Sequence, residues 1–80
     1  MKEFKLQIQT EDFDLVNELL EPEEIEITEW DELNNNIIDI KGLIFDEDYI
    51  IEQLKTIDEY KLTLEIKDNK NIKKYNIESN

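Results

Sequence analysis

The residues best placed to do chemistry in this 80-residue chain are carboxylates, and half of its 22 acids fall in one stretch. Residues 11–32 contain no basic residue, and lysine is absent from residue 6 through residue 40. Like charges held close together repel each other and oppose the compact state, so this tract costs stability unless a partner neutralises it. The tract comprises Glu11, Asp12, Asp14, Glu18, Glu21, Glu23, Glu24, Glu26, Glu29, Asp31 and Glu32.

Catalysis is not expected from these carboxylates. The chain has no histidine to act as a base near neutral pH, no cysteine thiolate and no arginine to clamp a phosphate. Paired carboxylates do hydrolyse glycosides, but acids this abundant form pairs by chance, and so short a chain leaves little room for a substrate cleft. We therefore predict a protein that is not an enzyme and uses no cofactor.

Metal binding is a weaker interpretation of the acids than helix capping. Residues 12–14 and 46–48 each place two acids two positions apart, as oxygen ligands for calcium often are. A calcium loop would continue with a third Asp or Asn and then glycine, whereas Val16 and Ile50 follow here. We expect these acids to cap helices and predict no metal site.

The overall charge of −13 also disfavours direct binding to nucleic acid, which requires clustered cations. The one basic cluster, which lies near Tyr75, is interpreted as the solvated edge of a hairpin, where lysines discourage pairing with other strands. It consists of Lys67, Lys70, Lys73 and Lys74.

The composition describes one small folded domain spanning residues 1–80. Thirteen Ile and nine Leu fall at periodic positions and suffice for one core, despite a mean hydropathy of −0.67. No signal segment and no apolar run of membrane-spanning length is present, so a cytoplasmic protein is expected. The richness in Ile, Lys, Asn and Glu, without Ala or Arg, is typical of an AT-rich genome, such as that of a low-GC bacterium or its phage.

Alternating apolar residues predict strands, and helical spacing predicts two helices between them. We expect a first strand over residues 3–10, a helix that begins at Thr10 or Asp12 and ends at Pro22, and a second strand around residues 25–28. A polar turn over residues 31–36 leads to a third strand over residues 38–44, where Gly42 indicates a bulge or a close backbone approach.

The second half of the chain repeats this order. A helix capped by Asp46 or Asp48 precedes a fourth strand over residues 61–67, and a turn at residues 68–71 leads to a fifth strand. In that last strand Ile72 is out of phase with Tyr75 and Ile77, which suggests a bulge between them.

The predicted class is therefore α+β, with two helices on one face of an antiparallel sheet. The order βαββαβ with an extra C-terminal strand resembles the ferredoxin-like split βαβ arrangement. That resemblance implies the strand order 4-1-3-2, with one open sheet face, and it says little about function because the fold hosts many unrelated activities.

The acidic tract favours a protein that binds a basic partner. Glu24 and Glu26 on one strand face would stand roughly 6.6 Å apart, close to the spacing of roughly 7 Å between phosphates along a DNA strand. We also expect acids at positions 11, 14, 18 and 21 to share one helix face. In size and composition the chain resembles phage-encoded DNA mimics, and this implies an anti-CRISPR or anti-restriction inhibitor, a viral protein that acts in the host cytoplasm.

Trp30 is the residue whose direction matters most for that hypothesis. If the alternation of Glu24 and Glu26 continues, Trp30 points outward among the acids and could anchor a partner. If the strand ends or bulges near Glu29, Trp30 turns inward to cap the core. The predicted partner-binding residues are Glu18, Glu21, Glu24, Glu26, Glu29, Trp30, Asp31 and Glu32.

Three other interpretations remain open. The acids could simply keep the protein soluble. The same surface could belong to an immunity protein or antitoxin that neutralises a basic toxin. The protein could also be an assembly subunit, a monomer or weak dimer that pairs through its sheet by a set of apolar residues. That set is Phe4, Ile8, Leu64, Ile66 and Tyr75.

Overall fold

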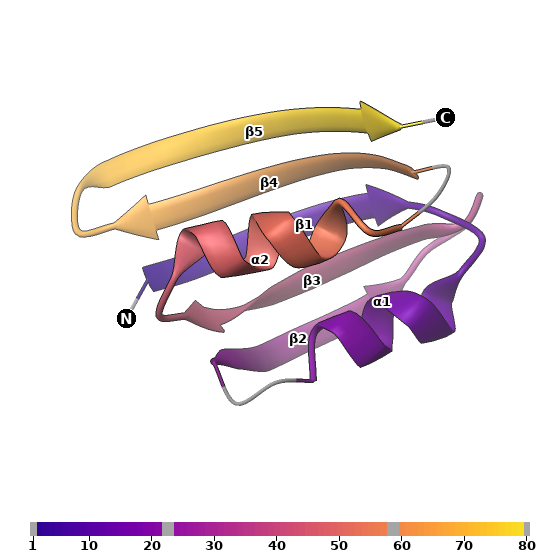
Figure 1. The fold of residues 1–80 in the computed structure, drawn as a ribbon, viewed down its shortest axis with the longest axis horizontal. Coiled ribbons are helices and arrows are strands. Elements are labelled where there is room, and N and C mark those ends of the chain that lie inside the picture. The colour runs from indigo at the N-terminus through magenta and orange to yellow at the C-terminus, as the bar shows by residue number, and fades with distance from the viewer. Residues whose placement is uncertain (1, 22–23, 58–59, 80) are drawn as a thin grey trace.

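A five-stranded antiparallel sheet forms one layer of the protein, and two helices cover one of its faces (Figure 1). The computed structural model describes residues 2–21, 24–57 and 60–79. The strand order is β2-β3-β1-β4-β5, and each pair of neighbours is antiparallel. The predicted α+β class is therefore confirmed. The elements are β1 (Lys2–Gln9), α1 (Phe13–Leu19), β2 (Ile25–Glu32), β3 (Ile37–Ile44), α2 (Glu47–Leu54), β4 (Tyr60–Asp68) and β5 (Asn71–Ser79).

The core lies between the helices and the sheet. In β1, for example, Phe4, Leu6 and Ile8 are all almost fully buried, whereas the residues between them are exposed. Val16 of α1 and Ile50 of α2 are fully buried above them. The other face of the sheet is open and mostly polar, so the period-two pattern of the sequence defines which side each strand turns to the core.

Both helices are short and begin at the expected caps. The Asp12 carboxylate accepts a hydrogen bond from the backbone N–H of Leu15 at 3.0 Å, and the Asp46 carboxylate accepts one from the N–H of Asp48 at 3.0 Å. These bonds satisfy backbone donors that a helix start leaves free. The first aspartate of each acidic doublet therefore caps a helix, as one of the two predicted alternatives in each case. The predicted stop at Pro22 lies outside the described residues.

Gly42 marks a close backbone approach, which was one of its two predicted roles. A Cβ atom added at Gly42 would overlap the carbonyl oxygen of Glu26 and would lie 2.7 Å from the Phe4 ring. The bulge itself lies in the facing strand, because the β2–β3 register shifts between Ile27 and Glu29 and leaves Thr28 as the extra residue. Glycine is therefore required where β2 bends over β3.

The bulge predicted in β5 is absent. The β4–β5 ladder continues from the pair Tyr60–Ser79 to the pair Asp68–Asn71 with no shift of register. Ile72 is out of phase because it simply points to the open face, where it is 54% exposed. The turn before β5 contains Asn69 at a φ of 57°, a conformation that asparagine tolerates better than most residues.

Candidate functional site

The acidic tract wraps around the free edge of β2 instead of forming one flat face. Directly paired residues of neighbouring strands share a face, and Glu26, Glu29 and Asp31 pair with open-face residues of β3. Beyond the bulge, Trp30 and Glu32 pair with the buried residues of β3 and therefore lie on the helix-covered side. We call described residues 11–21 and 24–32, that is α1, its flanks and β2, the acidic edge.

Trp30 therefore does not point outward, as unbroken alternation predicted. The extra residue in β2 inverts the alternation after Ile27, so the side chain turns to the helix side and packs, half-buried, against the core. The alternative that a bulge near Glu29 turns Trp30 inward is the one the structure shows. The indole N–H donates to Glu32 Oε1 at 3.5 Å.

The helical part of the acidic edge is shorter than expected. Only Asp14 and Glu18 of the four acids predicted on one face lie within α1, while Glu11 precedes the helix and Glu21 follows it. All four are exposed, and Glu24, which precedes β2, is exposed too. Carboxylates thus project from α1, from the connecting segment and from both sides of β2.

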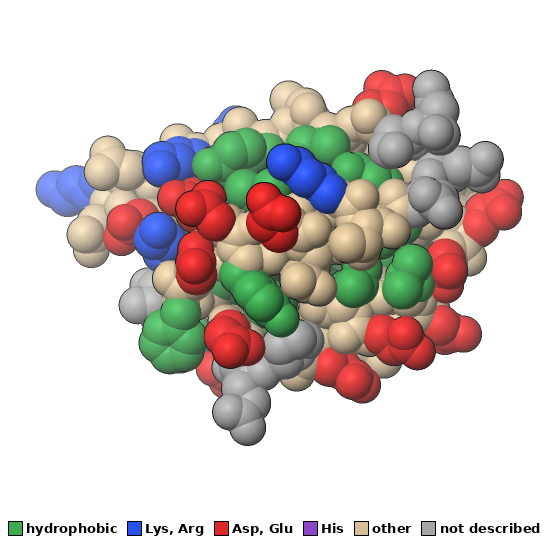
Figure 2. All heavy atoms as spheres, viewed as in Figure 1, with side chains coloured by type: hydrophobic (Ala, Val, Ile, Leu, Met, Phe, Trp, Pro, Cys, Tyr) green, Lys and Arg blue, Asp and Glu red, His purple; other side chains and the backbone are tan. Residues whose placement is uncertain are grey.

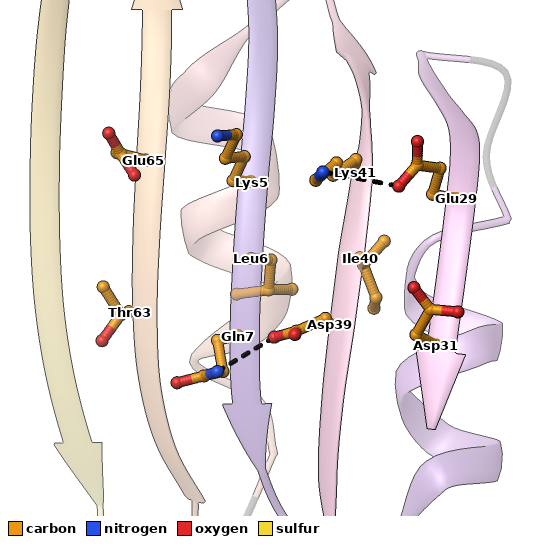
Figure 3. Close-up of a pocket in the computed structure, with 10 residues that line it drawn as sticks. All are labelled: Lys5, Leu6, Gln7, Glu29, Asp31, Asp39, Ile40, Lys41, Thr63 and Glu65. Atoms are coloured by element: carbon orange, nitrogen blue, oxygen red, sulfur yellow. Dashed lines mark hydrogen bonds and ion pairs between the residues drawn. The ribbon is translucent and has the colours of Figure 1, made fainter. Parts of the chain in front are cut away.

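Almost none of this charge is neutralised by the other residues that the structure describes. Among the ion pairs of the described residues, the acidic edge contributes one, in which Lys41 Nζ lies 3.5 Å from Glu29 Oε2 and both side chains are at least half exposed. Asp31 stands directly opposite Asp39, a like-charge pair that disfavours the strand pairing. Gln7 donates a hydrogen bond to Asp39 at 3.0 Å (Figure 3).

The centre of the open face differs from the acidic edge because acids and lysines are mixed there. One row across the five strands reads Glu29, Lys41, Lys5, Glu65, Lys74. All of this row except Lys74 lines a shallow hollow of about 320 Å³, together with residues of the next row on β1 to β4 (Figure 3). By register, the open face carries seven acids and five lysines, whereas the other described residues carry twelve acids and four lysines.

Most of the charge imbalance is therefore carried by residues off the open face, in the helices, the connecting segments and the turns as well as on the helix-covered side. Figure 2 shows that acidic side chains gather over α1, at the lower right of the view, and that lysines gather toward the hairpin of β4 and β5 at the left. A basic partner would be attracted to one end of the molecule, and long-range attraction of this kind speeds association.

A groove of about 450 Å³ lies between α1 and β2 within the acidic edge. Phe13, Ile27 and Trp30 form its apolar lining, and each is partly buried against the core. Asp14 and Glu32 provide carboxylates at the same groove. Sequence analysis named Trp30 and Glu32 among the partner-binding residues but predicted no groove, and it did not name Phe13, Asp14 or Ile27 as binding residues. The groove exists only because the bulge turns Trp30 toward α1.

A second charged cluster, which sequence analysis missed, joins β1, α2 and β5. Glu47 Oε1 lies 3.1 Å from Lys73 Nζ and 3.5 Å from Lys2 Nζ, and the Tyr75 hydroxyl donates to Oε2 at 3.3 Å. The hydrogen bond from Lys73 holds the pKa of Glu47 below its ordinary value of 4.5, against the opposing effect of burial, and Lys2 contributes. The same bond raises the pKa of Lys73. We call these four residues the Glu47 cluster.

The apolar residues proposed for assembly are not available on the open face. Phe4, Ile8, Leu64 and Ile66 are almost fully buried beneath the helices, and Tyr75 is half-buried on the same side. That expectation was wrong because the apolar phase of each strand is the phase that the helices cover.

Comparison with known proteins adds no relative: no family model, curated protein or solved structure matches the chain. Within residues 2–21, 24–57 and 60–79, no group of three or more side chains is arranged to hold a metal ion. None of the helices in the described part is long and apolar enough to cross a membrane.

Proposed function

We propose that this protein is a non-enzymatic inhibitor that binds the basic, nucleic-acid-binding surface of another protein through its acidic edge. The observation that supports the proposal is the unneutralised charge. The described part of the edge carries ten carboxylates and no lysine, with one ion pair to the rest of the described chain. A partner that supplies lysines and arginines would remove this repulsion, so binding would be driven by charge and weakened by salt.

The arrangement of the acids on β2 is compatible with imitation of phosphates. Glu29 and Asp31 are two residues apart on one side of the strand, which separates them by roughly 6.6 Å, near the phosphate spacing along a strand of DNA. Glu32 lies on the other side of the same strand. An edge strand with carboxylates on both sides would present negative charge to a groove that normally holds a nucleic-acid backbone.

We also infer that the domain is an elaborated ferredoxin-like fold. Read from β5, the sheet runs β5-β4-β1-β3-β2. Along the chain, α1 lies between β1 and β2, and α2 lies between β3 and β4. The inference leaves the function open, because this fold positions very different sites. The fold is relevant here because it places β2 at the free edge of the sheet. A partner can reach its open face directly and its helix side through the groove beside α1.

The proposal is tested by reversing charge at two places in parallel. One variant changes Glu24, Glu26 and Glu29 to Lys in the acidic edge. The matched control changes Glu52, Asp68 and Glu78 to Lys, which alters the net charge by the same amount at exposed positions elsewhere. Tagged proteins are used to capture partners from a nuclease-treated bacterial lysate, eluted with a salt gradient and identified by mass spectrometry.

We expect the wild type and the control to retain one nucleic-acid-binding protein that salt releases and that added DNA or RNA displaces. The acidic-edge variant should lose it while its circular dichroism spectrum remains that of the wild type. Retention of the same partner by both triple variants at moderate salt would contradict the proposal.

Assembly through the open face is a second candidate, and the charge balance of that face favours it. Seven acids and five lysines are mixed there, so two copies could pack face to face with far less repulsion than through the acidic edge. Leu43 and Ile72 would supply apolar contact. A dimer that persists in high salt and dissociates on Ile72→Lys substitution would support this function instead.

A further inference from the structure

We propose that the groove between α1 and β2 is a pocket for an arginine side chain of the protein partner. The inference rests on the proposed function, since it specifies how the acidic edge would recognise a basic protein. The groove combines two aromatic rings with two carboxylates, a combination that suits a planar cation better than it suits an apolar side chain or a free anion.

The aromatic part of the groove comes from both layers of the fold. Phe13 is the first residue of α1, and Trp30 and Ile27 lie on the helix-covered side of β2. Each of these side chains is only partly buried, so part of its surface remains open to solvent. That surface would be desolvated by the carbon stem of an arginine, whose guanidinium can stack on an aromatic face.

The carboxylates of the groove supply the acceptors that a guanidinium requires. Asp14 and Glu32 line it from opposite sides, one from the helix and one from the strand. Glu32 Oε1 accepts the indole N–H of Trp30 at 3.5 Å, a long contact, and neither carboxylate has an ion-pair partner among the described residues. Arginine presents several N–H donors in one plane, and it can bond a carboxylate while it stacks on the ring.

Charge complementarity selects this occupant over others. The groove belongs to the acidic edge, where residues 6–40 contain no lysine, so an anionic ligand would be repelled. A purely apolar side chain would fill the aromatic part but leave Asp14 and Glu32 desolvated without a partner, which costs binding energy. A lysine would satisfy the charge but would lack the planar stacking surface.

Trp30 is the sole tryptophan of the chain, so its fluorescence reports on the groove directly. The probe is a ten-residue peptide of glycine and serine with four lysines and one central arginine, carrying a dye for anisotropy. Two companion peptides lose one positive charge each, by citrulline in place of the arginine or by glutamine in place of a flanking lysine. A third carries lysine at the centre.

We expect the arginine peptide to change the Trp30 emission and to bind about fivefold more tightly than the citrulline peptide at low salt. Loss of a flanking lysine should weaken binding less, and central lysine should be intermediate. Among protein variants, Glu32→Gln and Phe13→Leu should each weaken the arginine peptide by a similar factor. Glu78→Gln, an equal charge change on β5, should weaken it less than twofold.

Two outcomes separate this inference from the proposed function. If the peptides bind with charge dependence but Trp30 emission is unchanged and Glu32→Gln behaves like Glu78→Gln, the groove is not the arginine pocket, and the acidic edge still stands. If the triple Glu24, Glu26 and Glu29 to Lys variant binds all peptides as the wild type does, the proposed function fails even where Trp30 responds.

Discussion

The acidic edge and the Glu47 cluster differ in whether their carboxylates are paired with lysines. At the Glu47 cluster, one carboxylate of α2 contacts two lysines and a tyrosine hydroxyl from β1 and β5, and its side chain is 14% exposed. At the acidic edge, ten described carboxylates share one ion pair, and both partners of that pair are at least half exposed. The two regions lie at different ends of one small sheet.

The comparison shows that the protein pairs a carboxylate with lysines where that carboxylate links a helix to strands. The Glu47 carboxylate ties the start of α2 to β1 and to the edge strand β5, contacts that span 26 to 45 residues of sequence. A partly buried, hydrogen-bonded group of this kind stabilises the fold, whereas exposed like charges oppose it. The acidic edge therefore costs stability, which screening by salt or a basic partner would return.

The largest expected effect comes from Gly42, on which the geometry of the acidic edge depends. Gly42→Ala places a Cβ against the Glu26 carbonyl and the Phe4 ring, and we expect a loss of about 3 kcal/mol in the free energy of unfolding. Because the overlap lies between β2 and β3, amide hydrogen exchange should accelerate most in β2, and Trp30 emission should shift to the red.

Lys41→Ala is the control at the neighbouring position. Among the described residues, the one ion pair of the Lys41 side chain is its exposed pair with Glu29, so its loss should cost less than about 1 kcal/mol. If Gly42→Ala were as stable as the control and left Trp30 emission unchanged, the close approach would not limit the fold, and the direction of Trp30 would need another cause.

The next effect comes from removing the charge of the Glu47 cluster. Glu47→Gln keeps the shape of the side chain but loses the ion pairs with Lys2 and Lys73, and we expect it to destabilise the protein by about 1.5 kcal/mol in urea unfolding. Glu52→Gln, an exposed change on the same helix, should be neutral or slightly stabilising because it lowers the net negative charge. If both variants changed the free energy of unfolding equally, the Glu47 carboxylate would stabilise the protein no more than an exposed acid does.

The pH dependence of that difference follows from the direction of the pKa shifts. The folded pKa of Glu47 lies below its ordinary value of 4.5, so its stabilisation is present above that pH and is lost as pH falls through the folded pKa. The gap between wild type and Glu47→Gln should be constant near neutrality and should close in acid. Since the pKa of Lys73 is raised above 10.5, no loss is expected at mildly alkaline pH. A gap that widened on acidification would contradict this assignment.

Local pattern was enough to predict most of the fold and part of the site. Alternation and helical spacing are properties of neighbouring residues, and they located all seven elements and both helix caps. The largest error in a strand end is in β2, which continues to Glu32, four residues beyond its predicted end and into the predicted turn. The exposed acids of the tract could also be predicted, because a carboxylate outside the apolar phase is seldom buried. What these acids bind is a prediction that the fold leaves untested.

The features that sequence analysis left open, such as the direction of Trp30, or missed, such as the Glu47 cluster, depend on distant residues. Trp30 turns inward because Thr28 is an extra residue in β2, opposite a glycine that lies fourteen positions further along the chain. One extra residue reverses the sheet face to which every later side chain of the strand points. Alternation within the strand does not reveal where such a residue lies. The Glu47 cluster left a fainter signal, since Lys2 and Lys73 occupy the apolar phase of their strands, where a charge needs a partner.

The smallest change in stability should come from a substitution in the acidic edge itself, and the sign of that change is the informative result. Glu18 lies in the last turn of α1, a turn without a basic residue, where the helix dipole disfavours a carboxylate. Glu18→Lys removes one repelling charge, adds an attractive one and complements the dipole, so we expect it to stabilise the protein by about 0.5 kcal/mol at low salt. Glu18→Gln should give roughly half of this gain. Both gains should shrink in about 1 M salt, where charges are screened beyond a few ångströms. If Glu18→Lys instead destabilised the protein, the acidic edge would hold a stabilising contact of its own, and its contrast with the Glu47 cluster would disappear.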